Sequence, residues 1–212
     1  MKLVLIHGRA QEGKDSIALK AFWVRALRDR LTSLGLALPV SENDIKFPYY
    51  GDTLYDLSSG AAETTEVIVR GEEGDDLDEF SREMLAEIVD RALERAKERG
   101  ETTEAELQEA LGQDVLERGF LNWKVVQKAL EWLDEKVPGA SAASIALATR
   151  DVHDYLKNPG IQHFIESGIR EAIPSGEESI VVSHSLGTVV AYNLLRREGE
   201  ARGWKVPLFV TL

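Results

Sequence analysis

The sequence predicts an α/β fold, a parallel sheet of about four strands with a large helical insertion in the middle of the chain. Short apolar segments rich in β-branched residues occur near both ends of the 212 residues, at 3–7, 178–183 and 206–211. Segments with apolar residues at helical spacing follow the first two of them. Strands that alternate with helices pair in parallel, so both observations lead to the same class.

In the first quarter of the chain, the pattern predicts a strand, a helix and a second strand. They are expected at 3–7, 17–34 and 44–50. Asp15 or Ser16 is the expected N-cap of the helix, because a short polar side chain there accepts the free N–H groups of the first turn. Pro48 lacks a backbone N–H and limits the pairing of the second strand. The unit predicts a parallel pair with a right-handed crossover.

The middle of the chain is predicted to be mostly helical. Apolar residues recur at helical spacing in four segments, at 77–99, 119–137, 141–156 and 161–173. Thr103 and Glu106 match a capping box, which starts a further helix. We expect 1–212 to form a single domain in which 53–160 is a mainly helical insertion or cap. An equally good interpretation of the last segment is a helix that packs on the sheet.

The most informative motif is the turn S-H-S-L-G at 183–187. The elements expected around it are a strand at 178–183, a helix at 186–197 and a strand at 206–211. A strand, a sharp turn and a helix are typical of a nucleophile elbow, with Ser185 at its tip. Strand and helix come close at such a turn, so the residues two before and two after the tip must be small, as Ser183 and Gly187 are. The N–H of Leu186 would point to where an oxyanion forms.

Two motifs resemble the α/β-hydrolases, in particular the lipase and serine-esterase-like branch, whose elbow reads G-H-S-L-G or S-H-S-L-G. The second motif is the opening strand, which ends in His7-Gly8-Arg9. In that family a strand ending in His-Gly precedes the oxyanion loop. The resemblance implies a sheet of the α/β-hydrolase type and an oxyanion hole made by the backbone N–H groups of Arg9 and Leu186. The residues that it implies as support for the elbow and the loop are His7, Gly8, Ser183, His184 and Gly187.

The resemblance implies a serine hydrolase that acts on a carboxylic ester, thioester or amide through an acyl-enzyme on Ser185. Its substrate would be a small-molecule or lipid-like acyl compound. A serine needs a base and an orienting acid, which in this fold follow it in the order Ser, acid, His. Residues 186–212 contain no histidine and no aspartate. We therefore expect an N-terminal fragment of a hydrolase, with a sheet incomplete at the C-terminus, and weak or no activity of this chain alone.

None of the four histidines is in a standard position for the base. His184 adjoins Ser185, but neighbouring side chains diverge in an elbow. His7 ends the first strand, where we expect a buried, hydrogen-bonded structural role. His153 and His163 precede the serine on predicted helices, so a base from either would be non-standard.

The opening loop has a second interpretation. Gly8–Lys14 fits G-x-x-x-x-G-K, the P-loop that binds phosphates in nucleotide-binding proteins. Asp15 stands where that motif has a Ser or Thr ligand for magnesium, and Glu12 adds negative charge near the phosphate position. The elbow therefore favours a hydrolase more than the loop favours a nucleotide site. A third interpretation is a non-catalytic hydrolase-like scaffold, which would explain the missing base and acid.

Composition excludes several classes of protein. The chain has no cysteine, and so no disulfide, thiol nucleophile or cysteine-bound metal. Its net charge of −12 argues against binding to nucleic acid. No apolar run reaches the roughly 18–20 residues of a membrane span, and no signal peptide is found, which indicates a cytoplasmic protein. We expect no cofactor and no metal. The apolar run 206–212 is typical of a central strand, and an unpaired edge there would favour self-association.

Overall fold

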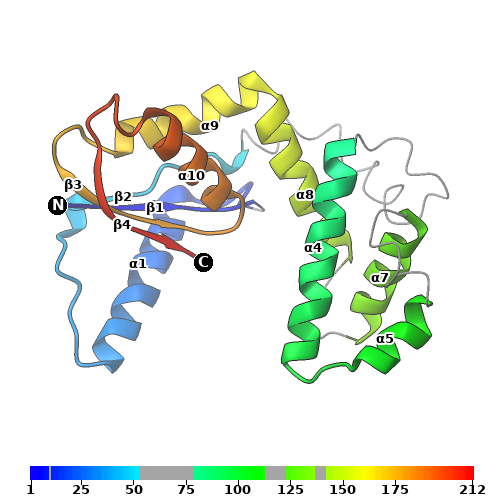
Figure 1. Cartoon of the computed structure of the whole chain (residues 1–212). Coiled ribbons are helices and arrows are strands. Elements are labelled where there is room, and N and C mark those ends of the chain that lie inside the picture. The colour runs from blue at the N-terminus through cyan, green and yellow to red at the C-terminus, as the bar shows by residue number, and fades with distance from the viewer. Residues whose placement is uncertain (10, 53–78, 113–122, 137–141) are drawn as a thin grey trace. The chain divides into compact units, whose positions relative to one another are not determined.

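The computed structural model describes residues 1–9, 11–52, 79–112, 123–136 and 142–212. The chain divides into two compact units (Figure 1). Met1–Ser59 and Asp154–Leu212 form one, here the sheet unit, and Gly60–His153 form the other, here the helical unit. The prediction of one domain with an insertion at 53–160 is not tested by this division and stays a prediction.

The sheet unit confirms the predicted α/β class. Its strands are β1 (Lys2–Ile6), β2 (Ile45–Lys46), β3 (Glu178–Ser183) and β4 (Lys205–Thr211). They lie in the order β2-β1-β3-β4, and every pair is parallel. The elbow strand β3 therefore lies directly beside β1, so the turns that follow these two strands meet at the same edge of the sheet.

The second strand is shorter than the sequence predicts. Only Ile45 and Lys46 pair with β1, whereas we expected a strand over 44–50. Two features beyond Lys46 explain the difference. Pro48 has no N–H for a ladder. The N–H of Tyr50 donates to the imidazole Nε2 of His7 at 3.1 Å instead of to a strand. The segment after β2 thus wraps around the end of β1.

Helix α1 (Ser16–Ser33) covers one face of the sheet, and its start confirms the predicted cap. The carboxylate of Asp15 accepts the N–H groups of Ile17 and Ala18 at 2.8 and 2.9 Å. Val24 packs with apolar side chains from the strands and from the segment before β2. The buried members of this core are Leu3, Leu5, Val24, Val40 and Ile45.

Helices α9 (Pro159–Ala172) and α10 (Leu186–Glu198) lie on the opposite face from α1 (Figure 1). Helix α10 contacts β1, β3 and α9. Its side chains Val190 and Leu194 are fully buried. Because α10 begins directly after the elbow, its packing fixes where the turn can lie.

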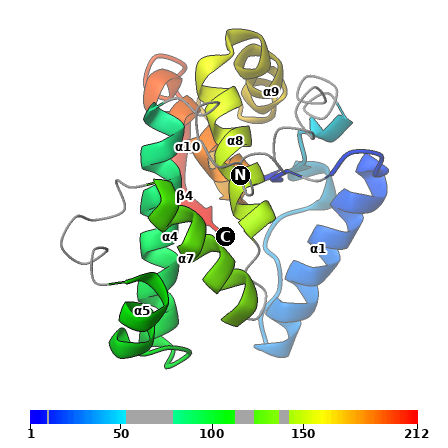
Figure 2. The same ribbon diagram turned by 90° about the vertical axis from the view of Figure 1, so that its right-hand side faces the viewer.

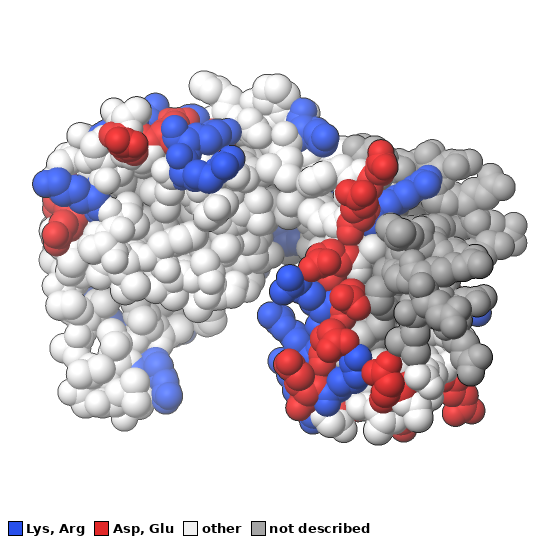
Figure 3. Space-filling view, viewed as in Figure 1, with Lys and Arg blue, Asp and Glu red and all other residues white. Residues whose placement is uncertain are grey.

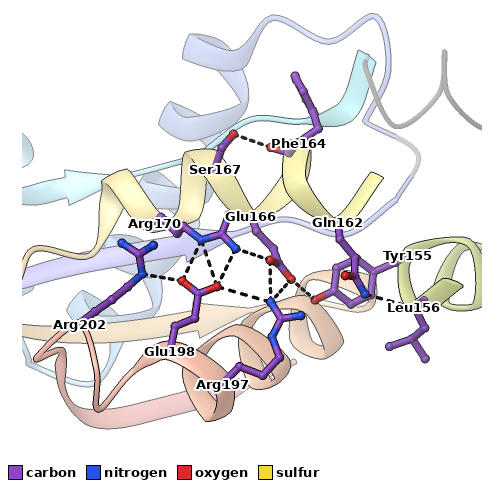
Figure 4. Close-up of polar contacts among 10 residues, drawn as sticks. All are labelled: Tyr155, Leu156, Gln162, Phe164, Glu166, Ser167, Arg170, Arg197, Glu198 and Arg202. Atoms are coloured by element: carbon purple, nitrogen blue, oxygen red, sulfur yellow. Dashed lines mark hydrogen bonds and ion pairs between the residues drawn. The ribbon is translucent and has the colours of Figure 1, made fainter. Parts of the chain in front are cut away.

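A polar cluster joins α9 to α10 (Figure 4). The carboxylate of Glu166 is buried and accepts hydrogen bonds from the Tyr155 hydroxyl at 2.7 Å, Arg170 at 2.6 Å and Arg197 at 2.7 Å. Arg170 also binds Glu198 with two nitrogen atoms, at 2.7 and 2.9 Å. Bidentate pairs of this kind are short and geometrically specific. The cluster ties the helix that carries the elbow to its neighbour.

Strand β4 has the apolar composition of a central strand, and its outer edge is unpaired in the described sheet, as expected for a sheet that is incomplete at the C-terminus. It lies at one edge of the described sheet, next to β3 alone. Leu208 is 50% exposed, and Val206, Phe209 and Val210 are only partly buried. The apolar composition of 206–212 is that of a central strand, but among the described elements no further strand or helix covers its open side.

The helical unit contains α4 (Glu79–Glu98), α5 (Glu104–Leu111), α7 (Trp123–Lys136) and most of α8 (Ala142–Lys157). Figure 2 shows α4, α5 and α7 side by side. The capping box is confirmed, since Thr103 accepts the Glu106 N–H and Glu106 accepts the Thr103 N–H. The buried core of this unit is Leu85, Val89, Leu93, Leu107, Leu111, Val125, Val126, Ala129, Leu130 and Leu133.

Acidic and basic side chains are mixed along one face of α4 (Figure 3). They line a shallow, polar groove and are Glu87, Asp90, Arg91, Glu94, Arg95 and Glu98. Mixed charges on one helix face are typical of a solvated surface.

Within the described part of the chain, no helix is both long and apolar enough to cross a membrane.

Candidate functional site

Ser185 occupies the tip of a sharp turn between β3 and α10, as predicted. It is the N-cap of α10, with φ 53° and ψ −128°. Among the described residues it is the one non-glycine with positive φ. An L-residue in this region costs on the order of 1–3 kcal/mol, so such a conformation persists only where the surroundings hold it. Ser185 is exposed at the carboxyl edge of the sheet.

The two glycines of the motifs are required by close approach. A Cβ on Gly187 would lie 2.4 Å from the carbonyl oxygen of His7 and 2.8 Å from that of Ile6. A Cβ on Gly8 would lie 2.8 Å from the Cβ of Ser185 and 2.9 Å from the carbonyl oxygen of His184. The structure thus places the loop after β1 directly against the elbow.

Two backbone donors are candidates for an oxyanion hole. Leu186 is the first residue of α10, and first-turn N–H groups have no intrahelical acceptor. The N–H groups of the next two residues, Gly187 and Thr188, donate to the carbonyl oxygens of His184 and Ser185, respectively. The Leu186 N–H has no backbone acceptor within the described residues. Arg9, the second candidate, follows Gly8 and therefore begins the loop that lies against the elbow.

His7 is buried, as expected for a structural residue. Its Nδ1 lies 2.7 Å from the carbonyl oxygen of Gly8, which can only accept, so Nδ1 carries the proton. Nε2 then accepts the N–H of Tyr50. Burial lowers the pKa of the His7 imidazole, which keeps the ring neutral near pH 7. The Tyr50 ring stacks on His7 at 4.0 Å, and its hydroxyl donates to the His7 carbonyl. His7 thus anchors the loop after β1.

Aromatic side chains continue from His7 to the elbow. The ring of Phe47 lies 5.6 Å from that of His7 and 5.7 Å from that of Trp23. Trp23 in turn makes an edge contact with the exposed ring of His184, at 6.2 Å between centroids. His184 therefore packs toward α1. The sequence offered no signal for this row of rings, because His7, Trp23, Phe47 and His184 come from four separate segments.

The geometry of the loop at 8–15 does not favour a phosphate site. The N–H groups that open α1 already bind the carboxylate of Asp15. The N–H of Gly13 donates to the carboxylate of Asp52 at 2.7 Å. A phosphate would need these same donors, and it would face two carboxylates. Tyr49 holds the loop in place, because its hydroxyl donates to the Gln11 carbonyl at 2.5 Å.

Among the residues that the structure describes, no base is hydrogen-bonded to the serine. No side chain among the described residues hydrogen-bonds to the Ser185 hydroxyl. His163 is exposed on α9. His153 belongs to the helical unit, where its ring lies 6.3 Å from that of Phe80. The described residues also contain no group of three or more carboxylates and histidines that could hold a metal ion.

Ser183, where the stricter elbow motif has glycine, is buried and hydrogen-bonded. Its hydroxyl lies 3.1 Å from that of Thr188 and 3.3 Å from the carbonyl oxygen of Val210. The strand–helix contact thus accommodates a serine because its polar atom finds partners on both sides. Thr188 was not predicted from the sequence; a hydroxyl in the first turn of the helix, five residues after Ser183, is the signal that could have indicated it.

Comparison with known proteins identifies no relative: no protein-family model, no curated protein and no solved structure matches the chain.

Proposed function

We propose that this protein is a serine hydrolase of the α/β-hydrolase type, with Ser185 as its nucleophile. The observation that carries the proposal is the strained conformation of Ser185, at the end of a parallel strand and the start of a helix. A strained residue at an exposed turn is characteristic of functional sites. The position of Gly8 against Ser185 adds independent support, since it brings the loop of a second strand to the same point.

The proposed reaction is acyl transfer to Ser185 from a carboxylic ester, thioester or amide. The serine oxygen bonds to the carbonyl carbon and gives its proton to a base, and the alcohol, thiol or amine leaves with a proton. Water then hydrolyses the acyl-enzyme. The negative charge that develops on the carbonyl oxygen would be stabilised by the N–H groups of Leu186 and Arg9.

The expected turnover of this chain is low, because no described side chain lies in position to accept the serine proton. Removal of a triad base typically costs about 10⁶ in kcat, while the oxyanion hole and substrate binding leave about 10³–10⁴ over the reaction in water. Slow covalent labelling is therefore the appropriate assay. We expect this residual effect to make Ser185 react faster than an exposed serine without an oxyanion hole.

The experiment exposes the 212-residue chain to a fluorophosphonate and measures the added mass on the intact protein and on its peptides. We expect slow labelling of Ser185, and no labelling of Ser185→Ala. Ser175→Ala is the matched control, since Ser175 is exposed in the loop before β3. Labelling that survives in Ser185→Ala, or none in the wild type, would overturn the proposal.

A second experiment tests the oxyanion loop. Arg9 is proposed to act through its backbone N–H, so Arg9→Ala should keep the labelling rate within about tenfold. Arg9→Pro removes the donor and should slow labelling by about 10²–10³ if the protein stays folded. Equal and large losses in both variants would contradict a backbone role.

A further inference from the structure

Two hydroxyls flank Ser185 on either side of the elbow. Ser183 is the last residue of β3, and Thr188 is in the first turn of α10. Their oxygen atoms lie 3.1 Å apart. The Ser183 side chain is fully buried. A buried hydroxyl without a partner would be costly, so the contact is a defined part of this turn.

The hydrogen bonds of this pair have a direction. The Ser183 oxygen also lies 3.3 Å from the carbonyl oxygen of Val210 on β4. A carbonyl only accepts, so Ser183 donates its one proton to Val210. The Thr188 hydroxyl must then donate to the Ser183 oxygen. A chain of two hydrogen bonds therefore connects the helix α10, the strand β3 and the strand β4.

Backbone hydrogen bonds complete this connection around the serine. The Thr188 N–H donates to the Ser185 carbonyl at 2.8 Å. The Ser185 N–H donates to the Leu212 carbonyl at 3.3 Å, and the Leu212 N–H donates to the Ser183 carbonyl at 2.9 Å. Both backbone polar groups of the strained residue are thus held by neighbours, and Thr188 participates with its backbone and its side chain.

We propose that Thr188 and Ser183 form an elbow latch, a hydroxyl pair that positions Ser185 for reaction. The inference rests on the proposed function and adds two positioning residues to it. Strained backbone is retained only where several contacts fix it at once. Without the side-chain link, α10 and β3 remain joined by the backbone, but the turn between them can relax and move the serine oxygen away from the oxyanion donors.

The experiment compares Thr188→Val, which keeps the shape and removes the hydroxyl, with Thr188→Ser, which keeps the hydroxyl. Labelling of Ser185 by a fluorophosphonate is followed at several probe concentrations, to separate the maximal rate from the apparent affinity. We expect Thr188→Val to lower the maximal rate by about tenfold, the effect of one hydrogen bond, with unchanged affinity. Thr188→Ser should restore the rate to within about twofold of the wild type.

Two further variants separate positioning from stability. Thr103→Ala removes the cap of α5 in the helical unit, so it should lower stability without changing the labelling rate. Ser183→Gly removes the other hydroxyl and introduces no steric clash, because glycine is smaller than serine. If the pair acts as one unit, Ser183→Gly and the double variant with Thr188→Val should label at the same reduced rate.

The outcomes distinguish the latch from the function on which it rests. If the wild type labels at Ser185 and both Thr188→Val and Ser183→Gly label equally fast, the latch is overturned and the proposed function stands. The latch is also overturned if Thr103→Ala, which lowers the melting temperature, slows labelling as much as Thr188→Val does. If the wild type does not label at Ser185, both proposals fail.

Discussion

Gly187 offers the sharpest test of how the elbow is built, through the substitution Gly187→Ala. The added Cβ would lie 2.4 Å from the His7 carbonyl oxygen and 2.8 Å from that of Ile6. Ordinary C···O contacts begin at about 3.3 Å, so strand and helix must separate by about 1 Å. Both obstacles are backbone atoms of β1 or its end, and they cannot rotate away as a side chain could.

The expected loss of stability is about 2 kcal/mol or more. Overpacking of a well-packed core typically costs about 1–3 kcal/mol, and contacts with backbone belong to the upper part of that range. Replacing glycine by alanine in a helix gains at most about 1 kcal/mol, and less in the first turn. The net effect is destabilising because the overlap exceeds the gain in helix propensity. Labelling of Ser185 should fall as well, since the shift moves the turn.

The assay is guanidinium denaturation followed by circular dichroism, with the midpoint compared at constant slope. Gly168→Ala on α9 is the matched control. The nearest atom to its added Cβ is the Cβ of Pro48 at 3.4 Å, an ordinary contact. We expect this variant to lie within about 1 kcal/mol of the wild type. A Gly187→Ala protein with the midpoint of the wild type would refute the close approach of α10 and β1.

Three further predictions concern stability. Arg170 and Arg202 lower the pKa of Glu198 to about 2, below its ordinary value of 4.5. The wild type should therefore lose stability as the pH falls from about 4.5 to 2. In thermal melts, Glu198→Gln should show a shallower dependence of stability on pH. The hydroxyl of Ser179 is buried without a hydrogen-bond partner among the described residues, so Ser179→Ala should raise stability by about 1 kcal/mol in denaturant; a loss of that size would show that the hydroxyl has a partner. Thr103→Ala should cost the helical unit about 1 kcal/mol, measured by amide exchange in α5, and an unchanged exchange rate would contradict the capping box.

The sequence by itself determined the elements that depend on local periodicity and local capping. The strand at 178–183 and the turn at 183–187 agree with the structure, and the helix after them is observed one residue longer than predicted. Asp15 and the capping box at Thr103 were predictable because their hydrogen bonds reach only two or three residues along the chain. The position of Ser185 at the tip follows from the same local pattern.

Tertiary structure alone decided how distant segments meet. The shortness of β2 depends on Tyr50, whose N–H binds His7 at the end of another strand. The contact of Gly8 with Ser185 exists because β1 and β3 are neighbours in the sheet. The polar cluster between α9 and α10 and the link from Thr188 to β4 likewise join separate elements.

The physical reason is the range of the interactions. Periodicity reports which face of a segment is apolar, and a cap reports a hydrogen bond within one turn. Neither specifies which strand lies beside which, and every contact around Ser185 beyond its own turn depends on that order. The position of Ser185 at the tip of the elbow could therefore be predicted from the sequence. The partners that hold Ser185 in its strained conformation could be identified only in the folded chain.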